Sequence, residues 1–130
     1  MCMTTCSLEQ KPEQTAKKFA KVLSADRNRA RVIIAFSPKE AEIARELFDR
    51  IGGISCNFIP KGKDITYVFW GFSASENIQI VIVMTSIDDE QARDIVAKMA
   101  GRKIPSKNIV VAAIIDCRKT KDGPTVVSLN

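Results

Sequence analysis

The sequence predicts an α+β domain in which a four-stranded antiparallel sheet carries two helices on one face. The first indication is the order of its segments, because short runs of β-branched residues alternate with stretches of helical periodicity as β-α-β-β-α-β. The second is that the middle two runs follow each other directly, which indicates a chain reversal rather than a helical crossover. The third is the length, since 130 residues have room for one hydrophobic core.

An amphipathic helix is expected ahead of this sheet. The stretch "TAKKFAKVL" places its apolar side chains at helical spacing, at Ala16, Phe19, Ala20 and Leu23. Residues 1–12 show no period and are expected to form a flexible lead, so that a single domain spans 13–130. The apolar run "RVIIAFS" then predicts a strand over residues 32–36 that is buried on both faces.

The next helix is marked at both ends. Ser37 is a suitable N-cap, Pro38 suits the first helical position, and Glu40 completes a Ser-x-x-Glu capping box. Gly52 and Gly53 supply the left-handed residue that often ends a helix. Between these signals the buried stripe consists of Ala41, Ala44, Leu47, Phe48 and Ile51.

The middle of the chain predicts a hairpin. "ISCNFIP" and "ITYVFWGF" have the composition of extended segments separated by "KGKD", and the break "GFSASEN" lets the chain reverse into "IQIVIVMTSI". The strands are expected over 54–59 and 78–84, the latter central. The aromatic residues at and before the break are expected to pack across the strand pair, or to cover a neighbouring subunit or a ligand; they are Tyr67, Phe69, Trp70 and Phe72.

The last third predicts a helix from Asp88, capped with Gln91 and ended at Gly101, and then a strand over 109–115. "TVVSL" suggests a further short edge strand. The resulting order is ferredoxin-like, with strand order 4-1-3-2 and both capped helices on one face. Because the strands are apolar on both faces, the uncovered face predicts a homo-oligomer, most simply a trimer.

Composition excludes several kinds of chemistry. The chain has no histidine, which rules out His-based zinc sites and Ser-His or Cys-His nucleophile pairs. The cysteines Cys2, Cys6, Cys56 and Cys117 form no Cys-x-x-Cys pair, and neither common phosphate-binding glycine motif occurs. The carboxylates on the helices are explained by solvation and the helix dipole. We therefore expect no catalytic site and no metal, and the lack of a long apolar run predicts no membrane span and a cytoplasmic protein.

Two loops could bind an anion. The net charge is +5 and the pI about 9.2, which permits a nucleotide, a nucleic acid or another anionic partner. "PKGKD" and "GRKIPSK" each combine glycine-exposed backbone N–H groups with lysine or arginine, which is suitable chemistry for phosphate.

These segments resemble a known family. Over residues 31–121, the element order is similar to that of the P-II nitrogen-regulatory superfamily and its structural relative, the CutA family. "RIGGISCNFIPKGK" is similar to the segment that leads into the ligand-binding T-loop, "FWGFSASENIQIVIV" resembles the third strand of small P-II-like proteins, and "AGRKIPSKNIVV" resembles the B-loop region. Lys119 and Lys121 match alternating basic residues for nucleotide phosphates. The resemblance implies a trimer with ligands held between subunits.

The function expected from the sequence is therefore non-enzymatic sensing of a nucleotide or other small anion, with signalling to a protein target. The expected ligand contacts are Lys61, Gly62, Lys63, Gly101, Arg102, Lys103, Lys107, Lys119 and Lys121. An RNA- or DNA-binding ferredoxin-like module is one alternative, because positive charge and sheet aromatics could contact bases. A structural oligomeric interaction protein is another. The sequence does not identify the ligand, the partner or a role for Cys2 and Cys6.

Overall fold

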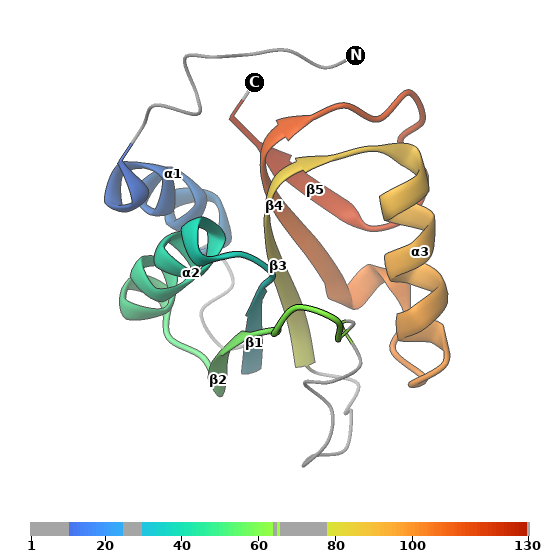
Figure 1. The fold of residues 1–130 in the computed structure, drawn as a ribbon, viewed down its shortest axis with the longest axis horizontal. Coiled ribbons are helices and arrows are strands. Elements are labelled where there is room, and N and C mark those ends of the chain that lie inside the picture. The colour runs from blue at the N-terminus through green and yellow to red at the C-terminus, as the bar shows by residue number, and fades with distance from the viewer. Residues whose placement is uncertain (1–10, 25–29, 64, 66–77, 130) are drawn as a thin grey trace.

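The computed structural model describes residues 11–24, 30–63, 65 and 78–129 (Figure 1). Within these ranges the helices are α1 (Pro12–Leu23), α2 (Pro38–Ile51) and α3 (Asp89–Ala100), with a short 3-10 turn at Ser106–Asn108. The strands are β1 (Ala30–Ala35), β2 (Ser55–Phe58), β3 (Ile78–Ile87), β4 (Ile109–Asp116) and β5 (Thr125–Ser128). None of the helices in the described part of the chain is long and apolar enough to cross a membrane.

The strands form one five-stranded sheet in the order β2-β1-β3-β4-β5, and every pair is parallel. The expected antiparallel, ferredoxin-like sheet is therefore wrong. The central position of β1 and β3 was predicted correctly, but β2 and β4 have exchanged sides relative to the order 4-1-3-2. The physical reason is the connection between β2 and β3. A hairpin was expected there, but because β2 and β3 are both parallel to β1, this connection is a crossover from the end of the sheet that holds the carboxyl ends of the strands back to the end that holds their amino ends.

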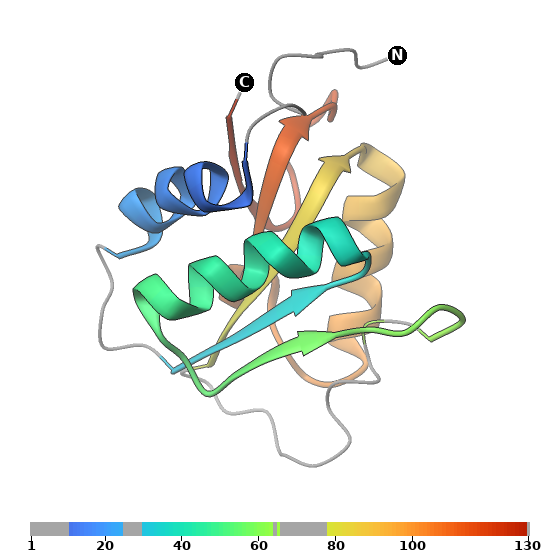
Figure 2. The same ribbon diagram turned by 60° about the vertical axis from the view of Figure 1, so that its left-hand side comes forward.

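Helices cover both faces of the sheet. α1 and α2 lie together on one face and α3 lies on the other (Figures 1 and 2), so the expectation of both capped helices on one face is also wrong. Alternate residues of each strand serve the two layers: Ile33 and Val81 pack in the core beneath α1 and α2, whereas Ile34 and Ile82 belong to the core beneath α3. The apolarity of both strand faces is thus explained within one chain.

The ends of the capped helices agree with the sequence. Ser37 Oγ accepts a hydrogen bond from Glu40 N at 3.2 Å, and Asp88 and Gln91 form the expected capping box of α3. Gly52 follows α2 with a φ of 71°, in the region that favours glycine. α1 is longer than expected and begins at Pro12, and β5 confirms the short edge strand.

A buried arginine, which sequence analysis did not single out, ties α1 to the sheet. The Arg31 side chain is 1% exposed. Its Nε donates a hydrogen bond to Gln79 Oε1 on β3 at 2.7 Å, and its Nη2 donates to the carbonyl of Leu23, the last residue of α1, also at 2.7 Å. This carbonyl has no partner within its own helix, so the guanidinium satisfies a helix end.

Two expectations fall outside the described residues. The expected flexible lead over residues 1–12 falls mostly on residues that the structure does not describe. The expected aromatic hairpin segment with Tyr67 and Trp70 falls entirely on such residues. Ile65, just before that segment, is buried in the core beneath α3.

Candidate functional site

The topology identifies one place on the sheet where a ligand site is expected. After β1 the chain turns into α2 on one face, and after β3 it turns into α3 on the opposite face (Figure 2). In open parallel sheets, ligands bind outside the carboxyl ends of strands at such a switch point. β1 and β3 are neighbours, so this point lies beyond Ala35 and Val83, the last residues that they pair.

A cavity of about 340 Å³ lies at this point, and we call it the switch-point crevice. It is lined by residues from β3, from the segment just after β1, from the first turn of α2 and from the first two turns of α3, namely Phe36, Glu40, Met84, Thr85, Ser86, Gln91, Asp94 and Ile95. The lining contains two carboxylates, two hydroxyls and an amide, but no lysine or arginine. Lys98, which is not part of the lining, pairs with Asp94 Oδ2 at 3.0 Å. The lining itself suits the hydroxyl and N–H donors of a ligand and offers no cation to an anionic group.

Glu40 links the two strands at the inner wall of the crevice. It is 9% exposed. Its Oε2 accepts hydrogen bonds from Thr85 N at 2.8 Å and from Thr85 Oγ1 at 3.3 Å, and its Oε1 accepts one from Phe36 N at 3.3 Å. The sequence predicted that Glu40 would complete a capping box. Its backbone N–H does bond to Ser37, but its carboxylate instead joins the ends of β1 and β3.

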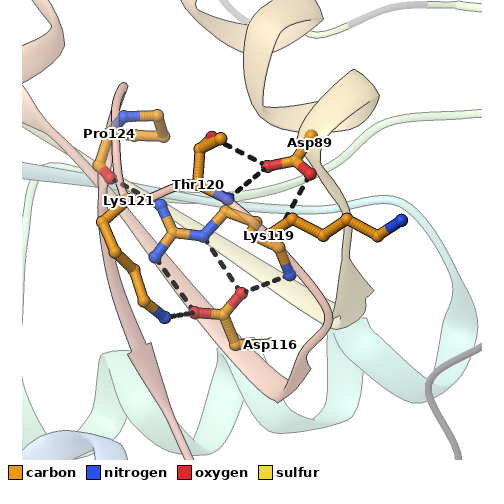
Figure 3. Close-up of polar contacts among 7 residues, drawn as sticks. Asp89, Asp116, Lys119, Thr120, Lys121 and Pro124 are labelled. Carbon is orange, nitrogen blue, oxygen red and sulfur yellow. Dashed lines mark hydrogen bonds and ion pairs between the residues drawn. The ribbon is translucent and has the colours of Figure 1, made fainter.

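On the far side of β3, a second polar cluster secures the loop after β4 to the start of α3 (Figure 3). Asp89 accepts hydrogen bonds from Lys119 N at 3.0 Å, Thr120 N at 3.1 Å and Thr120 Oγ1 at 2.9 Å. These backbone donors, Lys119 first, lower the pKa of Asp89. Arg118 likewise binds both carboxylate oxygens of Asp116 at 3.0 Å and lowers its pKa.

The second cluster has a consequence for α3. The Asp88 carboxylate already accepts from Gln91 N at 2.8 Å, and the neighbouring Asp89 carboxylate is bound to the loop. The positive end of the α3 dipole is therefore balanced by two carboxylates of the chain itself.

The structure divides the nine expected ligand contacts between opposite edges of the sheet. One group follows β2 or β4 and lies at the carboxyl edge, the end of the sheet where the strands finish and where the crevice lies: Lys61, Gly62, Lys63, Lys119 and Lys121. The other group lies between α3 and β4, at the amino edge, the end of the sheet where the strands begin: Gly101, Arg102, Lys103 and Lys107. A single chain therefore does not bring the "KGK" and "GRKIPSK" loops together. Their joint role between subunits stays a prediction.

A wider hollow of about 550 Å³ lies between α2 and the edge strand β2. Its wall includes Phe48, Cys56 and Phe58, and burial raises the pKa of the Cys56 thiol, which is free. It lies along a helix flank rather than at strand ends, so we do not regard it as the principal site. No cluster of three or more metal-ligating side chains occurs among the described residues.

Sequence analysis missed the polar residues of the switch-point crevice. The expected contacts did not include Thr85, Ser86 and Asp94, because the expected ligand was an anion and the residues chosen for it were basic residues and glycines. One signal was present: the aliphatic run "IQIVIVM" becomes polar at Thr85 and Ser86 before the chain enters a helix. Such a change at the carboxyl end of a strand points to a ligand site only once the sheet is known to be parallel.

No protein-family model and no curated protein matches the chain by sequence. Solved structures do match by fold. A hypoxanthine-guanine-xanthine phosphoribosyltransferase superposes with a TM-score of 0.61 at 16% identity, covering 90% of this chain and 74% of the other. A hypoxanthine phosphoribosyltransferase from Staphylococcus aureus gives 0.59 at 17%, covering 90% and 71%. One from Trypanosoma cruzi, in complex with its product IMP, gives 0.52 at 16%, covering 91% and 69%.

These neighbours correct the functional expectations. The fold they share with the chain is the phosphoribosyltransferase fold, so the resemblance to P-II-like and CutA-like proteins is wrong: element order was similar, but strand direction differs. The expectations of a non-enzymatic sensing or signalling protein and of a ferredoxin-like nucleic-acid or structural module are contradicted with it. The expected absence of an enzyme is contradicted too, because these neighbours are transferases.

Proposed function

We propose that this chain is an enzyme of the phosphoribosyltransferase type that acts on a purine nucleotide in the switch-point crevice. The observation that carries the proposal is the position and chemistry of that crevice, which lies at the carboxyl ends of β1 and β3 and is lined by carboxylates and hydroxyls. The chain around it has the fold of the phosphoribosyltransferases with which it superposes. The fold neighbours indicate the substrate class, since the one from Trypanosoma cruzi is in complex with IMP and another, from Leishmania tarentolae, is in complex with GMP.

The lining of the crevice suits a ribose. Asp94, whose Oδ2 pairs with Lys98, has a second carboxylate oxygen that can accept from the ribose hydroxyls, and Ser86 offers a hydroxyl that both donates and accepts. Phosphates would lie outside the crevice, toward Lys61, Lys63 and Lys119, which follow β2 and β4 at the same end of the sheet. This arrangement keeps a role in anion binding for the lysines at the carboxyl edge.

The negative lining also suits the transfer step. When a phosphoribosyl group moves to a base, the bond from the anomeric carbon to its leaving group breaks as the bond to the base nitrogen forms. The ribose ring then carries positive charge, as in the oxocarbenium-like transition states of glycoside hydrolysis. The buried Glu40 carboxylate, held by three hydrogen bonds, and the Asp94 carboxylate, which pairs with Lys98 at 3.0 Å, would lie near that ring and stabilise this charge more than they stabilise the neutral ground state.

Binding and turnover test this proposal separately. We expect IMP and GMP to raise the melting temperature of the protein more than inosine and guanosine do, and we expect IMP to form from hypoxanthine and phosphoribosyl diphosphate. Asp94→Asn should lower kcat/KM by about tenfold or more, since a hydrogen bond to a charged group contributes about 1.5 to 3 kcal/mol. Lys107→Ala, at the opposite sheet edge, is the matched control and should not change it.

Two results would overturn the proposal. One is the absence of any saturable response to IMP, GMP, the purine bases and phosphoribosyl diphosphate. The other is an equal loss of activity in Lys107→Ala and Asp94→Asn, because the site would then lie elsewhere.

Two further expectations remain proposals. We propose a cytoplasmic location, because such an enzyme would act on soluble nucleotides. We also propose assembly into a homo-oligomer. Two large apolar side chains are exposed at the edge strand β2: Ile54, just before the strand, at 57%, and Phe58, its last residue, at 46%. A second copy of the chain would cover both.

A further inference from the structure

We propose that the Glu40 carboxylate occupies an anion-binding cradle at the inner wall of the switch-point crevice, and that it thereby excludes phosphate from that position. The cradle consists of Phe36 N–H, Thr85 N–H and the Thr85 hydroxyl. This inference deepens the proposed function, because it assigns a residue that decides which part of a nucleotide enters the crevice.

The cradle arises from the way in which β1 and β3 separate. Their pairing ends at Ala35 and Val83, after which β1 turns toward α2 while β3 continues beside β4 as far as Ile87. In a parallel ladder alternate residues bond to alternate neighbours, so the N–H of Thr85 faces the side that β1 has left. A buried N–H without a partner is costly, and Glu40 removes that cost for Thr85 and for Phe36.

The group that fills this gap is a carboxylate, where a continued strand would supply a neutral carbonyl. Three donors converge on its two oxygens at 2.8 to 3.3 Å. Glu40 also lies in the first turn of α2, where the helix dipole favours negative charge. Convergent backbone N–H groups beside a hydroxyl and a helix start are the donors that bind phosphate oxygens in other proteins. Glu40 therefore stands in for an external anion.

The surroundings explain why phosphate does not compete in the native protein. Glu40 is 9% exposed, and the other carboxylate of the crevice lining, Asp94, is paired with Lys98 at 3.0 Å. At the cradle an incoming phosphate would meet the Glu40 carboxylate, which already engages Phe36 N–H, Thr85 N–H and the Thr85 hydroxyl. Removal of the Glu40 carboxylate reverses both conditions, because it lowers the negative charge and leaves Phe36 N–H and Thr85 N–H without an acceptor.

The test is a titration of five proteins with inorganic phosphate at constant ionic strength, with chloride as the balancing anion. The proteins are wild type, Glu40→Ala, Glu40→Gln, Glu42→Ala and the double variant Glu40→Ala with Thr85→Val. Glu42 is an exposed residue of the same helix, so its replacement changes the net charge as Glu40→Ala does without opening the cradle. Binding is followed by melting temperature and by the NMR shifts of the Phe36 and Thr85 amides.

We expect wild type and Glu42→Ala to show no saturable shift at these two amides. Glu40→Ala should bind phosphate at least tenfold more tightly than either, with a saturable rise in melting temperature. Glu40→Gln retains the size of the side chain without its charge and should shift the same amides at higher phosphate concentration. Adding Thr85→Val to Glu40→Ala removes the hydroxyl donor and should weaken the binding again.

The inference is overturned if neither Glu40 variant shifts the Phe36 and Thr85 amides, or if Glu42→Ala gains the same affinity as Glu40→Ala. Should Glu40→Ala not fold, Glu40→Gln decides the outcome alone. The probe is phosphate and no turnover is measured, so a failure here is distinct from a failure of the proposed transferase activity.

Discussion

Replacement of the buried arginine at the start of β1 tests how the layers are held together. Arg31→Met keeps much of the side-chain volume but removes the hydrogen bonds to Gln79 Oε1 and to the Leu23 carbonyl, both 2.7 Å long. A hydrogen bond to a charged group contributes about 1.5 to 3 kcal/mol, and a buried acceptor left without a partner costs about 1 to 3 kcal/mol. Part of this is offset because a buried charge no longer has to be desolvated. We expect a net loss of about 3 kcal/mol in the free energy of unfolding.

Urea unfolding followed by circular dichroism measures this loss, which corresponds to roughly 10 °C in melting temperature for a chain of this size. Gln79→Leu should also destabilise the protein, because it leaves the guanidinium without one buried acceptor. The double variant Arg31→Met with Gln79→Leu should lose at least 1 kcal/mol less than the sum of the single losses, since the two residues share an interaction. A loss below about 1 kcal/mol in Arg31→Met, or strict additivity in the double variant, would refute this reasoning.

Three further predictions concern a carboxylate, a helix cap and an oligomer surface. The pKa of Asp116 is lowered chiefly by its hydrogen bond from Arg118. The stability that this carboxylate contributes is therefore present above the unfolded pKa of about 3.9 and is lost as the pH falls through the lower folded pKa. Asp116→Asn should be about 1 kcal/mol less stable than wild type in urea at pH 7, and a difference that persists unchanged at pH 2 would contradict this. Ser37→Ala should cost about 1 kcal/mol in the same assay while Ser37→Thr costs less, and equal losses would argue against a capping role. Light scattering should show that the wild type is a homo-oligomer and that the double variant Ile54→Ser with Phe58→Ser dissociates into monomers. A wild-type monomer at tens of micromolar would exclude this surface as an oligomer contact.

Local chemistry made the helices predictable from the sequence. The hydroxyl of Ser37 satisfies an N–H that has no partner within the helix, and the pair Asp88 and Gln91 does so reciprocally, so these residues mark helix starts whatever the tertiary fold is. Gly52 marks a helix end for an equally local reason, its positive φ. The strands were located for the same kind of reason, because β-branched runs indicate extended structure without reference to their neighbours.

Strand direction could not be obtained in this way. The connection between β2 and β3 shows no helical periodicity in the sequence, so it was interpreted as a hairpin with an added strand. One global signal pointed to a parallel sheet: "IQIVIVM" and "NIVVAAII" are almost continuously apolar, as strands covered on both faces are. The same apolarity was attributed to a subunit contact. Burial of Ile33 beneath α1 and α2, and of Ile34 beneath α3, accounts for it without a partner.

The direction of the strands also decides which residues can share a site. In an all-parallel sheet, every segment that follows a strand begins at the carboxyl edge, and every segment that leads into a strand ends at the amino edge. Lys61 follows β2 and Lys107 precedes β4, so one chain cannot place them together, whatever their charge. The same rule brings the end of β1 next to the end of β3, which is why Glu40 can reach Thr85 across 45 residues of sequence. A pattern of charges therefore becomes a site prediction only after strand direction has been established, and here the groups that meet are acceptors and hydroxyls rather than lysines.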